Sequence, residues 1–140
     1  MKIYGILLAT ALAATAVFAQ TASITVWPKG APPAGTKVAD FGDHAMQIGQ
    51  RNASGRVEVH QTKADILVIQ SGTATLVTGG EVLDPTPTGP NELQGSSIKD
   101  GDSRQVGPGD VIEIPAGVPH QFLLAPGTQI TYLAVKVVRK

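Results

Sequence analysis

The chain has 140 residues, and its 11 Lys and Arg side chains balance 11 Asp and Glu side chains. This length is typical of one domain, and the lack of any basic stripe or run argues against nucleic acid as a partner. The sequence contains no cysteine, which excludes disulfides and thiol chemistry.

Residues 1–19 have the pattern of a secretory signal peptide. Lys2 provides the positive end, residues 6–14 form an apolar centre, and small residues precede a cleavage site. We therefore expect cleavage near Ala19-Gln20 and export to the periplasm or out of the cell. An uncleaved anchor is the alternative, but the apolar stretch is short for a membrane span. No other segment is apolar enough to cross a bilayer, so stable membrane insertion is not expected.

The segment 20–40 is predicted to form an extended arm ahead of the main domain. Within it, residues 28–37 contain three prolines and two glycines, a composition that disfavours helices and central strands. The main domain is then predicted to span residues 41–140.

After the arm, short runs rich in Val, Ile, Leu and Thr alternate with clusters of Gly, Pro, Asn and Asp. No sustained helical period is present there, so the pattern predicts an all-β domain, either a sandwich or a barrel. Region 83–103 has no strand pattern and is interpreted as a long connection or a disordered segment. The clearest strand candidates are 23–27, 45–50, 56–61, 65–70, 73–78, 111–114, 121–124 and 129–138.

The most informative stretch, 109–120, reads Gly-Asp-Val-Ile-Glu-Ile-Pro-Ala-Gly-Val-Pro-His. An apolar strand enters a Pro/Gly turn that ends on His120. The spacing Gly-x5-Pro-x-Gly-x2-His resembles the second sequence motif of the cupin family. The resemblance implies a single-domain cupin jelly-roll β-barrel in which His120 points inward and binds a metal ion.

Cupins also carry an earlier motif, whose two histidines and glutamate complete the metal site. Counting back from Gly72, Asp65 takes the glutamate position and His60 the second histidine position. The first histidine position falls on Glu58, which departs from the family pattern. A rival register makes His60 the first histidine and Thr62 the second, but it leaves only two residues before Asp65. We prefer the first register.

Strand stereochemistry supports this preference, because alternate residues of a strand share one face. Glu58, His60 and Thr62 would then point the same way. If that row faces the barrel interior, the resemblance implies that Glu58 and His60 lie near Asp65 and His120. The resulting set of two imidazoles and two carboxylates suits a divalent Mn, Fe, Zn, Ni or Cu ion, and the ligand types do not choose among them.

Each candidate ligand also has a purely structural interpretation. Glu58 and His60 fit an exposed row on a half-buried strand. Asp65 precedes an apolar run and fits a turn-capping residue, while His120 fits the end of a hairpin.

The barrel mouth is predicted to hold the ligand pocket. Thr62 is assigned to it as a polar neighbour of the metal ligands. Phe122, Leu124 and Tyr132 lie on strands near His120 and are assigned to its apolar walls, with the core as their alternative location.

The resemblance further implies a small-molecule ligand or substrate and, from the N-terminal arm, a homodimer. Cupins include dioxygenases, isomerases, decarboxylases, sugar-modifying enzymes and non-catalytic binders, and the fold does not choose among these. Our interpretation is an exported, metal-binding cupin-domain protein, of isomerase or dioxygenase type if it is an enzyme. The alternatives are a non-catalytic ligand-binding barrel and a structural protein that has lost its metal. A structural protein without its metal is less favoured, because two buried carboxylates without a cation would be costly.

Overall fold

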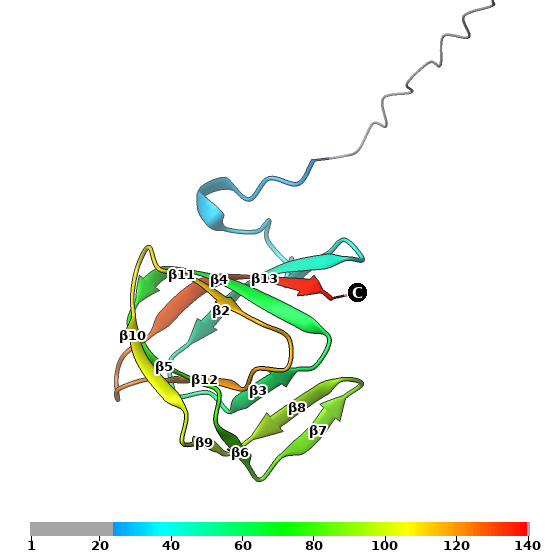
Figure 1. Ribbon diagram of the computed structural model, residues 1–140. Coiled ribbons are helices and arrows are strands. Elements are labelled where there is room, and N and C mark those ends of the chain that lie inside the picture. Colours follow the sequence, from blue (N-terminus) through cyan, green and yellow to red (C-terminus); the bar gives the residue numbers. More distant parts are fainter. Residues whose placement is uncertain (1–23, 140) are drawn as a thin grey trace, which may run out of the picture.

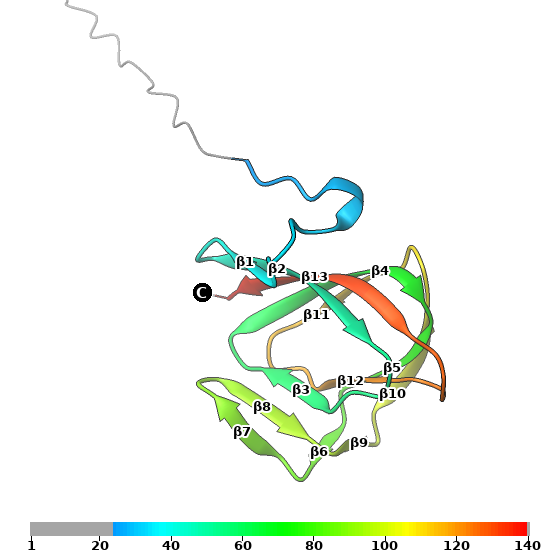
Figure 2. The ribbon, with the colours of Figure 1, turned by 180° about the vertical axis from the view of Figure 1, so that it is seen from behind.

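The computed structural model describes residues 24–139, so the predicted signal peptide lies outside the described residues. The described part is built almost wholly of antiparallel strands arranged in two facing sheets (Figures 1 and 2). The first sheet has the order β1 (Val38–Asp40), β2 (His44–Arg51), β13 (Ile130–Val138), β4 (Lys63–Gly72) and β11 (Val111–Ile114). The all-β class predicted from the sequence is confirmed.

The second sheet closes the other side of the barrel. Its order is β10 (Asp102–Val106), β5 (Ala74–Thr78), β12 (His120–Leu123), β3 (Val57–His60), β8 (Glu92–Gly95) and β7 (Thr86–Gly89). A small additional sheet pairs β6 (Glu81–Leu83) with β9 (Ser97–Lys99). No helix within residues 24–139 is long and apolar enough to cross a membrane.

Two expectations about strands are wrong. The segment predicted as a strand at 23–27 is not one over residues 24–27, and a short 3-10 turn, η1 (Pro28–Gly30), follows it. Region 83–103 is not a plain connection, because it contains β7, β8 and β9 and parts of β6 and β10. These strands are short and mostly polar, and β7 is exposed throughout, so they lack the apolar alternation that marks a strand. Their turns use the left-handed residues Asp84, Asn91 and Asp100.

The apolar core fills the space between the two sheets on the side away from β7 and β8. Strand β13 lies between β2 and β4, and its alternate residues Ile130, Tyr132 and Ala134 point inward and are buried. The rings of Phe122 and Tyr132, one from each sheet, meet with centroids 5.1 Å apart. This aromatic pair belongs to the core and also borders the polar interior described next.

Candidate metal centre

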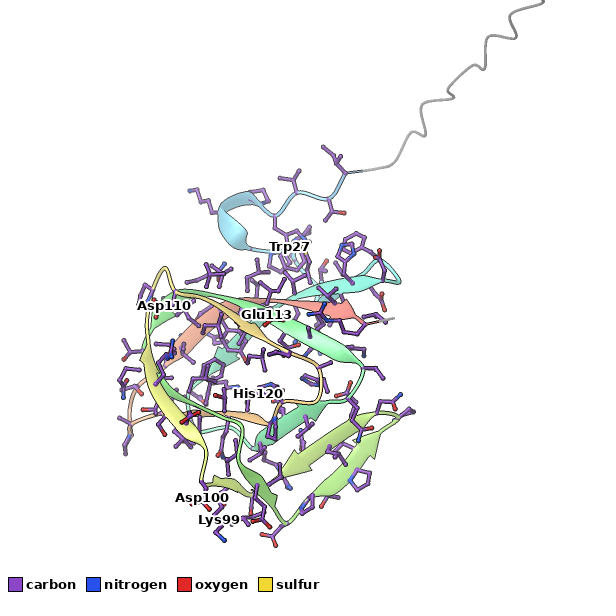
Figure 3. All side chains as sticks on the ribbon, viewed as in Figure 1. Trp27, Lys99, Asp100, Asp110, Glu113 and His120 are labelled. Atoms are coloured by element: carbon purple, nitrogen blue, oxygen red, sulfur yellow. The ribbon has the colours of Figure 1, made fainter. Side chains whose placement is uncertain are left out.

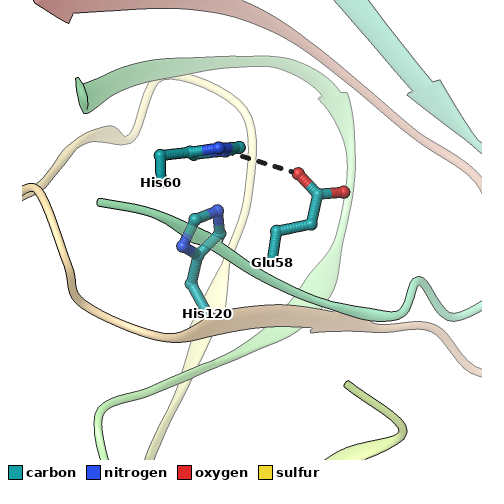
Figure 4. Close-up of side chains that lie close together, drawn as sticks. All are labelled: Glu58, His60 and His120. Carbon is teal, nitrogen blue, oxygen red and sulfur yellow. Dashed lines mark ion pairs between the residues drawn. The ribbon is translucent and has the colours of Figure 1, made fainter. Parts of the chain in front are cut away.

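Three potential metal ligands come from two neighbouring strands of the second sheet. Glu58 and His60 are alternate residues of β3, and His120, the first residue of β12, lies opposite Glu58 in the antiparallel register. One ligand atom from each of the three lies within 4.8 Å of the others, and the side chains converge in Figure 4. The imidazole centroids are 5.4 Å apart. The two histidines predicted from the sequence therefore face one site.

The Pro/Gly turn of the second motif explains how His120 reaches this position. The backbone N–H of Val118 donates to the Pro115 carbonyl at 3.2 Å, and that of Gly117 donates to the His60 carbonyl at 2.8 Å. Gly117 has a φ of 82°, which favours a residue without a Cβ. The turn is thus hydrogen-bonded to the last residue of β3, and β12 begins next to that strand. Figure 3 shows His120 directed into the barrel interior.

Asp65 approaches the same histidines from the opposite sheet. It lies on β4 and is only 4% exposed. Its Oδ2 is 3.4 Å from Nε2 of His60 and 3.6 Å from Nε2 of His120. Oε2 of Glu58 lies 3.7 Å from the same His60 nitrogen. Asp65 therefore lies near both histidines from the facing sheet, although the group of three mutually close ligands comprises Glu58, His60 and His120 without it.

Hydrogen bonds on the far side of each imidazole orient its inner nitrogen. Nδ1 of His120 donates to the Val118 carbonyl at 3.1 Å, because a carbonyl can only accept. Nδ1 of His60 contacts the carboxylate of Glu92, its cross-strand neighbour on β8. In neutral tautomers with Nδ1 protonated, both Nε2 lone pairs face the site. Such outer hydrogen bonds are the usual support of metal-binding histidines.

The donor set fits a first-row divalent metal. Ligands bound at about 2.1 Å and separated by tetrahedral or octahedral angles lie about 3.0–3.5 Å from one another. The distances of 3.4, 3.6 and 3.7 Å between nitrogen and oxygen atoms here are close to that range. Imidazole and carboxylate ligands accept Mn, Fe, Zn, Ni or Cu. The identity of a metal does not follow from these residues.

Two cations that the sequence analysis missed also enter the site. Nζ of Lys136 donates to both carboxylate oxygens of Asp65 at 3.0 Å and lies 2.7 Å from Nε2 of His60. Arg51 donates from Nη2 to Oε1 of Glu58 at 2.5 Å and from Nε to the hydroxyl of Tyr132 at 3.2 Å. Each of the two carboxylates, buried Asp65 and half-buried Glu58, therefore has its own counter-charge.

The alternation of inward and outward residues along β13 is the sequence signal that could have identified Lys136. In β13 the inward row runs Ile130, Tyr132, Ala134 and then Lys136, so a charged residue continues an otherwise apolar row. The register pairs Lys136 directly with Asp65. Opposite charges in that arrangement form a stabilising cross-strand pair. Glu92 carried no such signal, because its strand lies in the region interpreted as a connection.

These contacts shift the pKa values of the acidic groups downward. Burial by itself would raise the pKa of Glu58, but hydrogen bonding to His60 and the charge and hydrogen bond of Arg51 lower it to about 2. Burial likewise opposes ionisation of Asp65, and its contacts with His60 and Lys136 outweigh burial and lower its pKa. Both carboxylates are therefore ionised at neutral pH and available as ligands.

The two histidines respond in opposite directions. Burial lowers the pKa of His120, with partial opposition from the Val118 carbonyl and the nearby carboxylates. Burial also disfavours charged His60, but hydrogen bonds with Asp65, Glu58 and Glu92 outweigh it and raise the pKa to about 10. The positive charge of Lys136 opposes this rise. Across the 2.7 Å contact between His60 and Lys136, only one of the two nitrogens can donate.

Comparison with solved structures shows the fold family, while comparison of sequences finds no matching family model and no matching curated protein. A protein with a double-stranded β-helix domain from Klebsiella pneumoniae is 13% identical with a TM-score of 0.55, over 84% of this chain and 90% of that chain. A cupin protein from Bacteroides fragilis is 16% identical with a TM-score of 0.50, over 86% of each chain. The protein has the cupin fold.

The similar structures also include larger proteins. The polyketide cyclase RemF from Streptomyces resistomycificus is 21% identical with a TM-score of 0.46, over 74% of this chain. The cupin chain described here spans 56% of the length of that cyclase.

The cupin barrel contains a small cavity beside the candidate metal centre. Its volume is about 100 Å³, enough for a few waters or a molecule of a few non-hydrogen atoms. The cavity is lined by acidic, basic, amide and apolar residues from both sheets, namely Gln47, Arg51, Arg56, Glu58, Asp65, Leu67, His120, Gln121, Phe122, Tyr132, Ala134 and Lys136.

The four residues assigned from the sequence to the ligand pocket fall in different places. Phe122 and Tyr132 line the cavity. Leu124 is not among the lining residues and packs against the core cluster. Thr62 lies in the turn between β3 and β4, where its side chain is exposed and its carbonyl accepts from the Arg139 backbone. Thr62, which is a metal ligand in the rival register, therefore lies outside the site.

Proposed function

We propose that this cupin binds a divalent transition-metal ion through Glu58, His60 and His120, with Asp65 as a fourth ligand, and uses it to bind or convert a small anionic molecule. The convergence of the two Nε2 atoms with carboxylate oxygens from both sheets carries the proposal. The outer hydrogen bonds of both imidazoles support it, because they direct the inner nitrogens toward one point.

The residues around the cavity favour a small anion as the ligand. Arg51, Arg56 and Lys136 line the cavity, against Glu58 and Asp65 as its acidic groups. With both carboxylates engaged by a metal, the three basic side chains would attract a carboxylate or a similar anion. A metal bound there would supply Lewis acidity toward an oxygen of the ligand. Tyr132 and Gln121 offer further hydrogen bonds, and Phe122 limits the space.

We also propose that the protein is exported after cleavage near Ala19-Gln20 and that it forms a homodimer. The support is the signal pattern in residues 1–19 and the resemblance of the arm to those of cupins. The intact mass of the exported protein should lack residues 1–19, and light scattering should give twice the mass of one mature chain. A full-length mass or a monomeric species would contradict the respective proposal.

Metal analysis of wild-type and variant proteins tests the main proposal. Protein purified without chelators or a metal-binding tag should contain a near-stoichiometric metal, and an added divalent ion should raise the melting temperature of chelator-treated protein. His60→Ala and His120→Ala should each abolish most of both effects, because each removes a ligand.

Two substitutions serve as controls for this experiment. Thr62→Ala changes an exposed residue outside the cavity, and His44→Ala removes the third histidine, whose ring pairs with Asp43 on the surface. Both should leave metal content and the melting shift unchanged. If wild type binds none of Mn, Fe, Zn, Ni and Cu, the metal proposal is wrong.

A metal-free ligand-binding barrel is the second candidate. One observation favours it: Arg51 and Lys136 already balance Glu58 and Asp65. In that case the folded protein would contain no metal, and a small organic anion would be released from it on denaturation.

A further inference from the structure

Lys136 contacts the same atoms that the proposed metal would need. Its ammonium lies 2.7 Å from Nε2 of His60 and 3.0 Å from both carboxylate oxygens of Asp65. Each imidazole nitrogen has one in-plane bonding position, so it holds a proton, accepts a hydrogen bond or binds a metal, and does only one of the three. For His60, the contact with Lys136 and a metal bond therefore exclude each other.

Lys136 also faces the cavity beside the site. Lys136 is among the residues that line the cavity, whereas His60 is not. The lysine side chain is 20% exposed and emerges from β13 opposite Asp65.

The polar interior is complete with the lysine in this position. Within residues 24–139, no buried side-chain nitrogen or oxygen lacks a hydrogen-bond partner. Asp65 has its counter-charge in Lys136, and Glu58 has its own in Arg51. A metal ion would therefore have to replace existing interactions and would not simply fill a vacancy among orphaned groups.

We propose that Lys136 is an intramolecular competitor of the metal: its ammonium holds His60 and Asp65 in the metal-free protein and must swing away from them when a metal binds. This inference rests on the proposed metal-binding function. The released ammonium would remain at the cavity wall, where it adds a positive charge for an anionic ligand. Metal loading would in this way alter both the inner ligands and the charge of the cavity.

Metal affinity of Lys136→Met tests the inference. Methionine keeps the length and apolar stem of lysine but cannot hold His60 or Asp65. Titration of chelator-treated protein with Zn²⁺ alone, followed by calorimetry, should show about 10- to 100-fold tighter binding than wild type. The matched control is Lys63→Met, because Lys63 contacts Glu92 at the edge of the site at 3.5 Å. Its affinity should stay near that of wild type.

The outcomes separate this inference from the function on which it rests. If wild type binds Zn²⁺ and Lys136→Met binds it equally or more weakly, Lys136 is not a competitor. If Lys136→Met binds Zn²⁺ and wild type binds none of the five metals, Lys136 competes with the metal, but the proposed metal-binding function of the wild-type protein is wrong. If Zn²⁺ and the other four metals fail to bind to either protein, the metal-binding function itself is wrong and the inference falls with it.

A second measurement uses the wild-type chain and does not depend on the folding of a variant. Acetylation of lysines, read by mass spectrometry, should modify Lys136 slowly in chelator-treated protein and severalfold faster with saturating Zn²⁺. Lys63 serves as the internal reference and should react at the same rate in both states. An unchanged or slower reaction of Lys136 in the Zn²⁺-loaded protein would show that the ammonium stays in place.

Discussion

The two sides of the barrel interior contribute to the site in different ways. The sheet containing β3 and β12 supplies Glu58, His60 and His120, which resemble a metal-binding set. The facing sheet supplies two cations, Arg51 from β2 and Lys136 from β13. We call the first group the ligand side and the second the cation side. Glu58 on the ligand side is half-buried, and Arg51 matches its charge from across the barrel, while Lys136 matches Asp65 within the facing sheet.

Both carboxylates of the site have a counter-charge that does not depend on a metal. Two buried carboxylates were expected from the sequence to be costly without a metal, because the roles of Arg51 and Lys136 were not recognised. Arg51 on Glu58 and Lys136 on Asp65 offset part of that cost. Metal binding would then exchange the carboxylates' ion pairs with Arg51 and Lys136 for bonds to the metal. Such an exchange need not be coupled to folding.

The largest expected effect comes from breaking the cation side at Lys136. In chelator, Lys136→Met should lower the free energy of unfolding by about 3 kcal/mol, because Asp65 keeps its buried charge and loses its partner. Urea denaturation at neutral pH measures this loss. The double variant Lys136→Met with Asp65→Asn should recover much of it. A single variant as stable as wild type would mean that the cation side does not balance Asp65.

Acid denaturation tests the ion pair between Arg51 and Glu58. The pKa of Glu58 is lowered from 4.5 to about 2 in the folded protein, so its contribution to stability is present above pH 4.5 and is lost as the pH falls toward 2. In chelator, Glu58→Gln should therefore lose less stability than wild type over this range, by up to about 3 kcal/mol. Urea denaturation at a series of pH values gives the free energy of unfolding as a function of pH for both proteins.

The matched control for this pH series is Glu113→Gln. Glu113 forms an exposed ion pair with Arg139 at 3.1 Å, away from the cavity lining. Its stability should follow the wild-type pH profile closely. Parallel profiles for Glu58→Gln and wild type would show that Arg51 and His60 do not hold Glu58 ionised.

A smaller effect is expected at Gly49, which packs against Tyr132, the hydrogen-bond partner of Arg51. A Cβ at Gly49 would lie 2.3 Å from Cζ of Tyr132, whose hydroxyl accepts from Arg51. Gly49→Ala should therefore displace the ring and destabilise the protein by about 1–3 kcal/mol. Gly89→Ala is the control, because nothing lies within 4 Å of its added Cβ. Equal stability of the two variants in urea would show that Gly49 does not provide room for Tyr132.

Features that depend on a few neighbouring residues were predictable from the sequence. Strand β11 matches its predicted bounds of 111–114, and the Pro/Gly turn places His120 in the interior. Such features depend on alternation and turn chemistry within a few residues. The strands between 83 and 103 were missed, because they are short and mostly polar and are formed by pairing with each other and with β3 and β5. Glu92 was missed with them.

The sequence by itself determined the all-β class, the strand alternation that turns Glu58 and His60 to one face, and the turn that ends on His120. Only the tertiary structure decided what lies opposite them. Lys136 follows Asp65 by 71 positions, and it reaches that carboxylate because β13 pairs with β4 in one particular register. A shift of one residue would turn Lys136 to the outer face. Register between distant strands depends on packing of the whole barrel, so the cation side could not be read from any local pattern.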